Sequence, residues 1–150
     1  MTLVLITTIG YSQIEKPYFQ QQVNYNITVE LDDENHELVA FEKVSYTNNS
    51  QRTLHFVYFH LWPNAYKNYN TALGKQQLEE HNTQLYFAPD EILGYIDGLE
   101  FKVGEENLQW NYTPNNDDIC IVHLLDPLRP GETVEITTPF NIKIPKGIFS

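Results

Sequence analysis

Two long stretches of alternating apolar and polar residues constrain the fold of this chain more than any other feature. The first has Val23, Tyr25, Ile27, Val29 and Leu31 on one face of an extended chain. The second places Val134, Ile136, Thr138, Phe140, Ile142 and Ile144 on one face. A period of two residues is typical of an antiparallel β-strand that buries one face and keeps the other in water. The chain is therefore expected to be mainly β.

Further strands are expected between these two stretches, separated by turn-forming residues. Residues 37–48 return from a polar turn at 32–35. Residues 53–61 follow a second turn at 48–51, so the first three strands predict a meander. The other expected strands are a hairpin over residues 99–112 that turns at 104–107, and a short apolar strand at 119–125.

The period changes between residues 66 and 89, where residues 71–80 predict a short helix capped by Asn70 or Thr71. Gly74 is an unfavourable residue inside that helix. Pro139 lies on the polar face of the last strand and predicts an edge strand or a bulge, because proline donates no ladder hydrogen bond. The predicted fold is an antiparallel saddle-like or sandwich-like β domain with one short helical insertion around residues 71–80.

Both ends of the sequence carry signals of their own. Residues 1–12 combine an apolar run with small residues before Gln13, which is typical of the end of a secretory signal peptide. A basic start is missing, so the true N-terminus is expected upstream or at another start, and a buried N-terminal strand is the alternative. We expect a signal-peptide remnant at 1–12, one β domain at 13–150, and an exported protein that is periplasmic, on the cell surface or secreted. Residues 145–150 end without a capping element, which predicts a longer chain.

The charge balance limits the classes of binding partner, and the cysteine count limits the disulfides that the chain can form. The chain has 20 acidic against 9 basic residues, a net charge of -11, and no cluster of Lys and Arg that would bind phosphate backbones. The apolar run near the N-terminus is too short to span a bilayer. We therefore expect no nucleic-acid partner and no membrane insertion. Cys120 is the single cysteine and lies in an apolar run, so it is expected to be a small buried hydrophobe and excludes an internal disulfide.

Residues with catalytic or metal-binding chemistry do not form a recognisable motif. The histidines are His36, His55, His60, His81 and His123. None belongs to a His-Glu-x-x-His helix, and no Gly-x-Ser-x-Gly nucleophile elbow occurs. Residues 115–118 offer oxygen ligands for calcium but lack the glycine and distal glutamate of an EF-hand loop. We predict no catalytic, substrate-binding or metal-binding residue in this chain.

Other polar and aromatic residues leave binding hypotheses open. Three asparagines, Asn26, Asn48 and Asn111, begin glycosylation sequons, which matter only in a eukaryotic secretory route. Five aromatic residues offer rings that stack on sugars or peptides, and the same pattern is also typical of packing within a sheet. These five are Trp62, Tyr66, Tyr69, Trp110 and Tyr112.

The segment from Phe59 to Lys67 combines a strand end with a Trp-Pro stop and a polar turn. Both faces of the strand at 53–61 are largely apolar, which predicts a strand covered on two sides. Pro63 cannot donate to a ladder and biases Trp62 toward an extended conformation, so strand pairing is expected to end there.

Five ordered blocks, taken together, resemble the N-terminal domain of the aminopeptidase-N-like family of gluzincin zinc metallopeptidases, in a bacterial exported branch. The blocks are Tyr46–Ser50, Phe59–Tyr66, Gly94–Ile96, Pro127–Glu132 and Pro139–Pro145. The resemblance runs from about Phe19 to Ser150. The residues that carry its signature, in structural roles, are His60, Trp62, Pro63, Asn64 and Tyr66.

The resemblance implies a saddle-shaped β domain that packs against a downstream catalytic domain and caps its cleft. In the family, zinc is held by a His-Glu-x-x-His helix and a later Glu, and a Gly-x-Met-Glu-Asn segment binds the substrate amine. Neither matches any position of this sequence. Zinc and peptide substrates are therefore expected only for the full-length parent, and no cofactor for this fragment. The alternative is a stand-alone cell-surface β-sandwich module that binds sugars or peptides.

Overall fold

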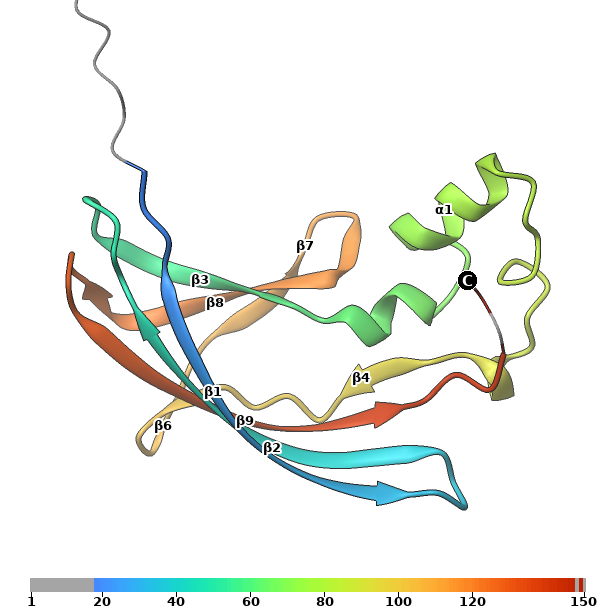
Figure 1. Cartoon of the computed structure of the whole chain (residues 1–150), viewed down its shortest axis with the longest axis horizontal. Helices are drawn as coiled ribbons and strands as arrows, with labels where there is room; N and C mark the ends of the chain where they lie inside the picture. Colours follow the sequence, from blue (N-terminus) through green and yellow to red (C-terminus); the bar gives the residue numbers. More distant parts are fainter. Residues whose placement is uncertain (1–17, 148, 150) are drawn as a thin grey trace, which may run out of the picture.

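The computed structural model describes residues 18–147 and 149 (Figure 1). Residues 1–12, the expected signal-peptide remnant, lie outside the described residues. The strands are β1 (Gln22–Asp32), β2 (Glu37–Thr47), β3 (Leu54–His60), β4 (Tyr95–Asp97), β5 (Lys102–Val103), β6 (Glu106–Asn107), β7 (Trp110–Thr113), β8 (Asn116–Leu128) and β9 (Thr133–Lys143). The helices are the 3-10 helices η1 (Trp62–Tyr66) and η2 (Asp90–Ile92) and the α-helix α1 (Ala72–Glu79).

Two antiparallel sheets make up a mainly β, sandwich-like fold that is not a closed barrel. The larger sheet has six strands in the order β1-β2-β9-β5-β6, and β4 also pairs with β9. The smaller sheet has three strands in the order β3-β8-β7. Figure 1 shows β1, β2 and β9 curving beneath the smaller sheet, with α1 at one end. The predicted fold class is confirmed.

The core lies between the two sheets and is built from one face of each. Val57, Cys120 and Val122 come from the smaller sheet, while Ile96 and Ile136 come from the larger one. Cys120 is fully buried as predicted, and this burial raises the pKa of its thiol to about 11. A thiol that stays protonated near neutral pH is a poor nucleophile, so Cys120 serves packing alone.

The predicted meander of the first three strands is wrong, because β3 pairs with β8 instead of β2. Asn48 explains the change of sheet. Its side chain is fully buried, and its Nδ2 donates to the carbonyl oxygens of Arg52 (2.7 Å) and Leu128 (2.9 Å). These bonds turn the chain out of the larger sheet immediately after β2 and align it with the end of β8.

The prediction of an edge strand or bulge at Pro139 is also wrong. β9 is a central strand, and its pairing with β2 is continuous through the position where Pro139 faces Phe41. On the other side of β9, β4 ends opposite Asn141 and β5 pairs only at Thr137. Among residues 18–147, no strand pairs with Pro139 on that side. A residue without an N–H is therefore tolerated inside the sheet.

The second hairpin is confirmed near its turn but diverges beyond it. Val103 faces Glu106 across the β5–β6 turn, and the Leu108 N–H donates to the carbonyl oxygen of Phe101 (2.8 Å). The chain then crosses to the smaller sheet, where β7 pairs with β8. The short strand expected at 119–125 is the middle of the longer β8.

The predicted helix is confirmed as α1, with Thr71 as its N-cap. The Thr71 hydroxyl accepts a hydrogen bond from the Gly74 N–H (3.1 Å) and donates to the carbonyl oxygen of Ala65 (2.7 Å). Gly74 is required by close packing, because a Cβ at this position would lie 2.5 Å from the Tyr69 carbonyl oxygen.

Asn64, at the opposite end of β3 from Asn48, joins the two sheets a second time. It is fully buried, its Nδ2 donates to the Asp117 carbonyl oxygen (2.8 Å), and its Oδ1 accepts from the Ile96 N–H (3.0 Å). Asp117 belongs to β8 in the smaller sheet, whereas Ile96 belongs to β4 in the larger one.

Replacing Asn64 by alanine is expected to lower the free energy of unfolding by about 3 kcal/mol, because the buried Ile96 N–H and the partly buried Asp117 carbonyl oxygen both lose their partner. Urea unfolding followed by tryptophan fluorescence measures the change. Asn70→Ala is the matched control at an exposed position, where a loss below about 0.5 kcal/mol is expected. Equal losses for the two variants would contradict this role of Asn64.

Gly74→Ala tests the close packing of α1. Alanine is favoured over glycine by about 1 kcal/mol inside an exposed helix. Here the added methyl group meets the Tyr69 backbone, so we expect a net loss of about 1 to 3 kcal/mol in the free energy of unfolding. Thermal unfolding of Gly74→Ala and of the exposed-site control Lys75→Ala checks the sign. A stabilised Gly74→Ala variant would show that the backbone relaxes away from the clash.

Candidate functional site

The histidines and carboxylates do not converge on a metal site. Among residues 18–147 and 149, no group of three or more His, Cys, Asp or Glu side chains is placed to hold a metal ion. The histidines are all exposed and lie in the β1–β2 turn, on β3, after α1 and on β8; they are His36, His55, His60, His81 and His123. Asp117, in the segment considered for calcium, forms an ion pair with Lys67 (3.3 Å). The residues described here do not fit a zinc site.

The family-signature residues separate into two environments. Trp62 begins η1 and Pro63 follows it in the first turn, so the expected extended conformation of Trp62 is wrong, although β3 does end before it. Asn64 is buried, and the half-buried Tyr66 packs near the ring of Phe149 (centroids 6.2 Å apart). His60 and Trp62 are instead exposed, and their rings stack 5.0 Å apart at an interplanar angle of 16°. Trp62 exposes 68% of its surface, which is unusual for a tryptophan and points to a contact surface.

The five aromatic residues considered for stacking do not form a single platform. Trp110 and Tyr112 are half-buried and make an edge-to-face pair (5.4 Å) at the border of the core. Tyr69 pairs with Tyr86 beside α1 (4.8 Å), far along the chain from the core pair. Of the five, Trp62 alone lines the groove described below. The sequon asparagine Asn48 is buried, so a glycan cannot be attached there without unfolding its turn.

The apolar side of β1 has no cover within the described residues. Residues directly opposite in an antiparallel pair share a face, and Val29 faces Ala40 of β2, which in turn faces Phe140 of β9. This side of the sheet therefore continues the face that forms the core. On β2, Ala40 and Val44 of this face are still buried, so the loss of cover is seen at β1. The β1 side chains left exposed on it are Tyr25 (62%), Ile27 (49%), Val29 (51%) and Leu31 (61%). We call this apolar side of β1 the uncovered face.

The predicted double cover of β3 is likewise wrong, because one face of β3 is largely open to solvent. Val57 is buried, whereas Tyr58 and Phe56 expose 58% and 40% of their surfaces. β3 is an edge strand of a sheet of only three strands, and the sequence gives no measure of how far the sheets extend.

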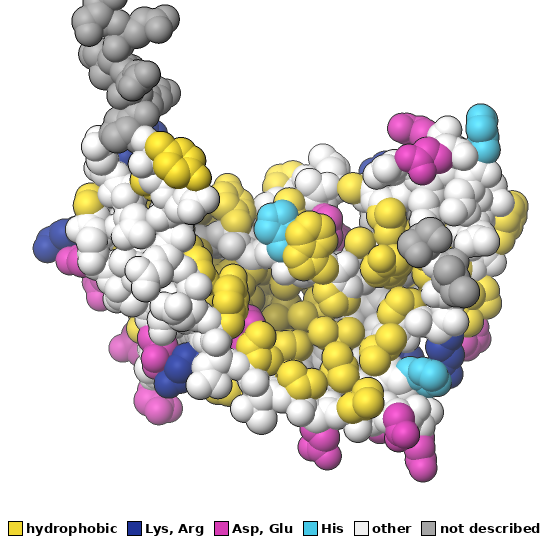
Figure 2. Space-filling view, viewed as in Figure 1, with side chains coloured by type: hydrophobic (Ala, Val, Ile, Leu, Met, Phe, Trp, Pro, Cys, Tyr) yellow, Lys and Arg dark blue, Asp and Glu magenta, His cyan; other side chains and the backbone are white. Residues whose placement is uncertain are grey.

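A groove of about 450 Å³ runs between the uncovered face and the end of β3. Figure 2 shows the hollow on this side of the molecule, with hydrophobic side chains over its floor. The groove is lined by Val23 and Tyr25 of β1, Glu42, Val44 and Tyr46 of β2, Val57, Tyr58, Phe59 and His60 of β3, and Trp62 of η1.

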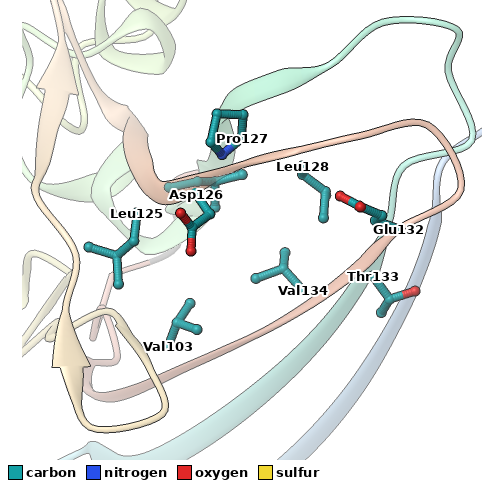
Figure 3. A pocket seen from close by; sticks show the side chains of 9 residues that line it. Val103, Leu125, Asp126, Pro127, Leu128, Glu132, Thr133 and Val134 are labelled. Carbon is teal, nitrogen blue, oxygen red and sulfur yellow. The ribbon is translucent and has the colours of Figure 1, made fainter.

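A second pocket, of about 370 Å³, lies where β8 turns into β9 (Figure 3). Val103 and Val134 line one side of it, and Leu125 and Leu128 of β8 line the other. Of the two carboxylates at this pocket, that of Glu132 already accepts the Arg129 N–H (2.7 Å) within the turn. The pocket is the open end of the sandwich and has no convergent set of polar groups.

Glu42 is the one charged side chain in the groove, and sequence analysis did not identify it. It is half-buried opposite Ile27 of β1 and Thr138 of β9. Burial raises the pKa of the Glu42 carboxyl above its ordinary value of 4.5, and it also raises the pKa of the nearby Tyr46. A signal did exist in the sequence, because Glu42 interrupts an otherwise apolar series at alternate positions, Leu38, Ala40, Val44 and Tyr46.

Comparison of the sequence with protein-family models and with curated proteins finds no match. The part of the chain that the structure describes contains no helix with the length and hydrophobicity of a membrane span. Because these comparisons suggest no function, the proposal below starts from two structural features, the groove beside Trp62 and the uncovered face of β1.

The raised pKa of Glu42 predicts how stability depends on pH. A carboxyl whose pKa is higher in the folded chain binds more protons there, so its contribution to stability falls as pH rises from 4.5 through the folded-state pKa. Glu42→Gln removes this loss. The variant is expected to be more stable than the wild type at pH 7, and the difference is expected to shrink toward pH 4.

Urea unfolding of both proteins across this pH range measures the effect. The other titratable groups lining the groove are Tyr25, Tyr46, Tyr58 and His60, and all are kept in both proteins. Glu30→Gln, at an exposed carboxyl on β1, is the control for loss of a negative charge. A pH-independent difference between Glu42→Gln and the wild type would refute the burial argument.

Proposed function

We propose that this chain is the N-terminal, non-catalytic domain of an exported zinc metallopeptidase, and that its uncovered face packs against the catalytic domain of the same protein. The parent is an aminopeptidase that hydrolyses N-terminal residues of peptides, and this domain shapes and caps the active-site cleft. The observation that carries the proposal is the uncovered face itself. Four neighbouring apolar side chains of β1 are about half exposed or more, and one of them, Tyr25, lines the same groove as the exposed Trp62.

Such a face favours a permanent neighbour. Soluble monomers rarely keep a contiguous apolar patch larger than a few hundred Å² in water. The alternation in β1 is that of a strand with one buried face, so the sequence already contains the pattern of a covered strand. A docked domain would supply that cover. Tryptophan is among the residue types most enriched in the hot spots of protein–protein interfaces, so the exposed Trp62 is suited to such a contact.

The assignment to a metallopeptidase rests on the ordered sequence blocks that resemble the aminopeptidase-N-like family. The zinc ligands of that family have no counterpart in this chain, so zinc and catalysis belong to the downstream domain in this proposal. Continuation of the reading frame is expected to encode a His-Glu-x-x-His motif and a later Glu. A complete downstream frame without them would overturn the assignment.

The docking role is tested with two neighbouring residues of β1. Val29→Asp places a charge on the uncovered face, while Thr28→Asp places the same charge on the opposite face of the strand. We expect Val29→Asp to weaken binding of this chain to the separately produced downstream domain by about tenfold or more. Thr28→Asp is expected to have little effect.

Calorimetric titration measures the affinities, and hydrolysis of an aminoacyl chromogenic substrate by the full-length protein follows the consequence for activity. The 150-residue chain alone is expected to be inactive in the same assay, with or without added zinc. Equal effects of the two aspartates on binding would show that the uncovered face is not the docking surface.

The second candidate is a stand-alone cell-surface module that binds sugars or peptides. Its support is the exposed Trp62 at the rim of an open groove, stacked on His60. A stop codon directly after Ser150, together with retention of a glycan or peptide that Trp62→Ala abolishes, would favour this function over the first.

A further inference from the structure

Glu42 is a carboxylate in the middle of an apolar surface. Its partners across the strands are Ile27 and Thr138, and its neighbours on the same face of β2 are Ala40 and Val44. Both Ala40 and Val44 are buried. The strand register thus directs Glu42 to the side of the sheet that contains the core, whereas the adjacent Lys43 points to the other side and pairs with Glu135 (2.9 Å).

Within the described residues, Glu42 has no cation beside it. The ion pairs join Lys43 to Glu135, Lys67 to Asp117, Lys102 to Glu100 and Lys143 to Glu37. Burial raises the pKa of the Glu42 carboxyl, and no neighbouring charge or hydrogen bond lowers it again. A half-buried carboxylate without a partner costs free energy in the isolated chain. A positive group arriving from outside would offset that cost.

The rest of the groove has the chemistry that attracts such a group. Tyr25, Tyr46, Tyr58 and Trp62 line it, so four electron-rich aromatic residues share one groove with the carboxylate. Aromatic ring faces bind cations, and tryptophan binds them best. The chain as a whole carries a net charge of -11, which steers a basic surface toward it.

We propose that the groove receives a basic side chain, best an arginine, carried by an otherwise apolar segment of the docked partner. Glu42 supplies the counter-charge and the aromatic rings supply faces for stacking. Arginine is favoured over lysine because its planar guanidinium pairs with a carboxylate through two hydrogen bonds and stacks on aromatic rings. This inference rests on the proposed function for the identity of the partner, the catalytic domain. The chemistry of the groove is independent of that identity.

The test uses two peptides that differ only in charge. Acetyl-Leu-Arg-Leu-amide carries the guanidinium, and acetyl-Leu-citrulline-Leu-amide replaces it with a neutral group of the same shape. Each is titrated into the 150-residue chain and followed by NMR chemical-shift changes. We expect the arginyl peptide to bind about fivefold more tightly, with shifts concentrated at Trp62, Tyr25 and Glu42.

Variants assign the preference to Glu42. Glu42→Gln is expected to lose most of the preference for the arginyl peptide, because only the aromatic rings still favour the cation, while Glu30→Gln, which removes an exposed charge from β1, keeps the full preference. Thermal unfolding confirms that both variants are folded. Equal affinity of the wild type for the two peptides, or no detectable binding of either, would overturn the proposal.

The two proposals can fail separately. If Val29→Asp abolishes docking of the downstream domain but the peptides bind equally, the docking role stands and the cation site is wrong. If the arginyl peptide binds in a Glu42-dependent manner but the downstream frame encodes no peptidase, the cation site stands and the proposed function is wrong.

Discussion

Two buried asparagine side chains hold the two sheets of this protein together. Asn48 precedes β3 and Asn64 follows it, so the two amides secure opposite ends of the smaller sheet. Each is fully buried and forms hydrogen bonds with backbone groups on segments far apart in the sequence. Because an unpaired amide or peptide group would be costly in this environment, the bonds specify a single arrangement of the sheets. The position of the groove, the exposure of Trp62 and the placement of Glu42 opposite β3 all depend on it.

The second constraint is the unequal size of the sheets. A three-stranded sheet cannot cover a larger sheet whose long strands curve beneath it, so the apolar side of β1 remains open. The opening is not a packing defect, because β1 pairs with β2 over its whole length without a register shift. The same geometry explains why a glutamate is tolerated at a position where its neighbours on the strand are buried. Its cost is smaller in an open groove than in a closed core, and it leaves a negative group among the aromatic side chains of the groove.

Local patterns predicted the elements of the fold better than their partners. The alternation in β1 and β9 and the cap and position of α1 follow from interactions within a few residues, and each was predicted from the sequence. The meander failed because alternation contains no information on which strand lies alongside. The prediction of an edge strand or a bulge at Pro139 failed because the gap between β4 and β5 arises from residues about 40 positions earlier in the chain. The two-sided cover of β3 failed because apolar composition does not reveal the extent of a neighbouring sheet.

The candidate site also combines features that local sequence patterns predict with features that depend on the tertiary structure. Sequence patterns alone were enough to predict a mainly antiparallel β domain, a buried Cys120, and a strand end followed by a sharp turn within residues 59–67, because backbone stereochemistry and side-chain hydrophobicity act locally. The sequence also shows Glu42 within an alternating series of apolar residues. This observation could be interpreted only once the structure showed which face of β2 is buried. The packing of the two sheets determines which apolar faces are covered, which aromatic residues share a groove, and where Glu42 lies. These properties depend on contacts between strands that are far apart in the sequence. Such contacts form because the folded domain as a whole buries apolar surface and satisfies its hydrogen bonds.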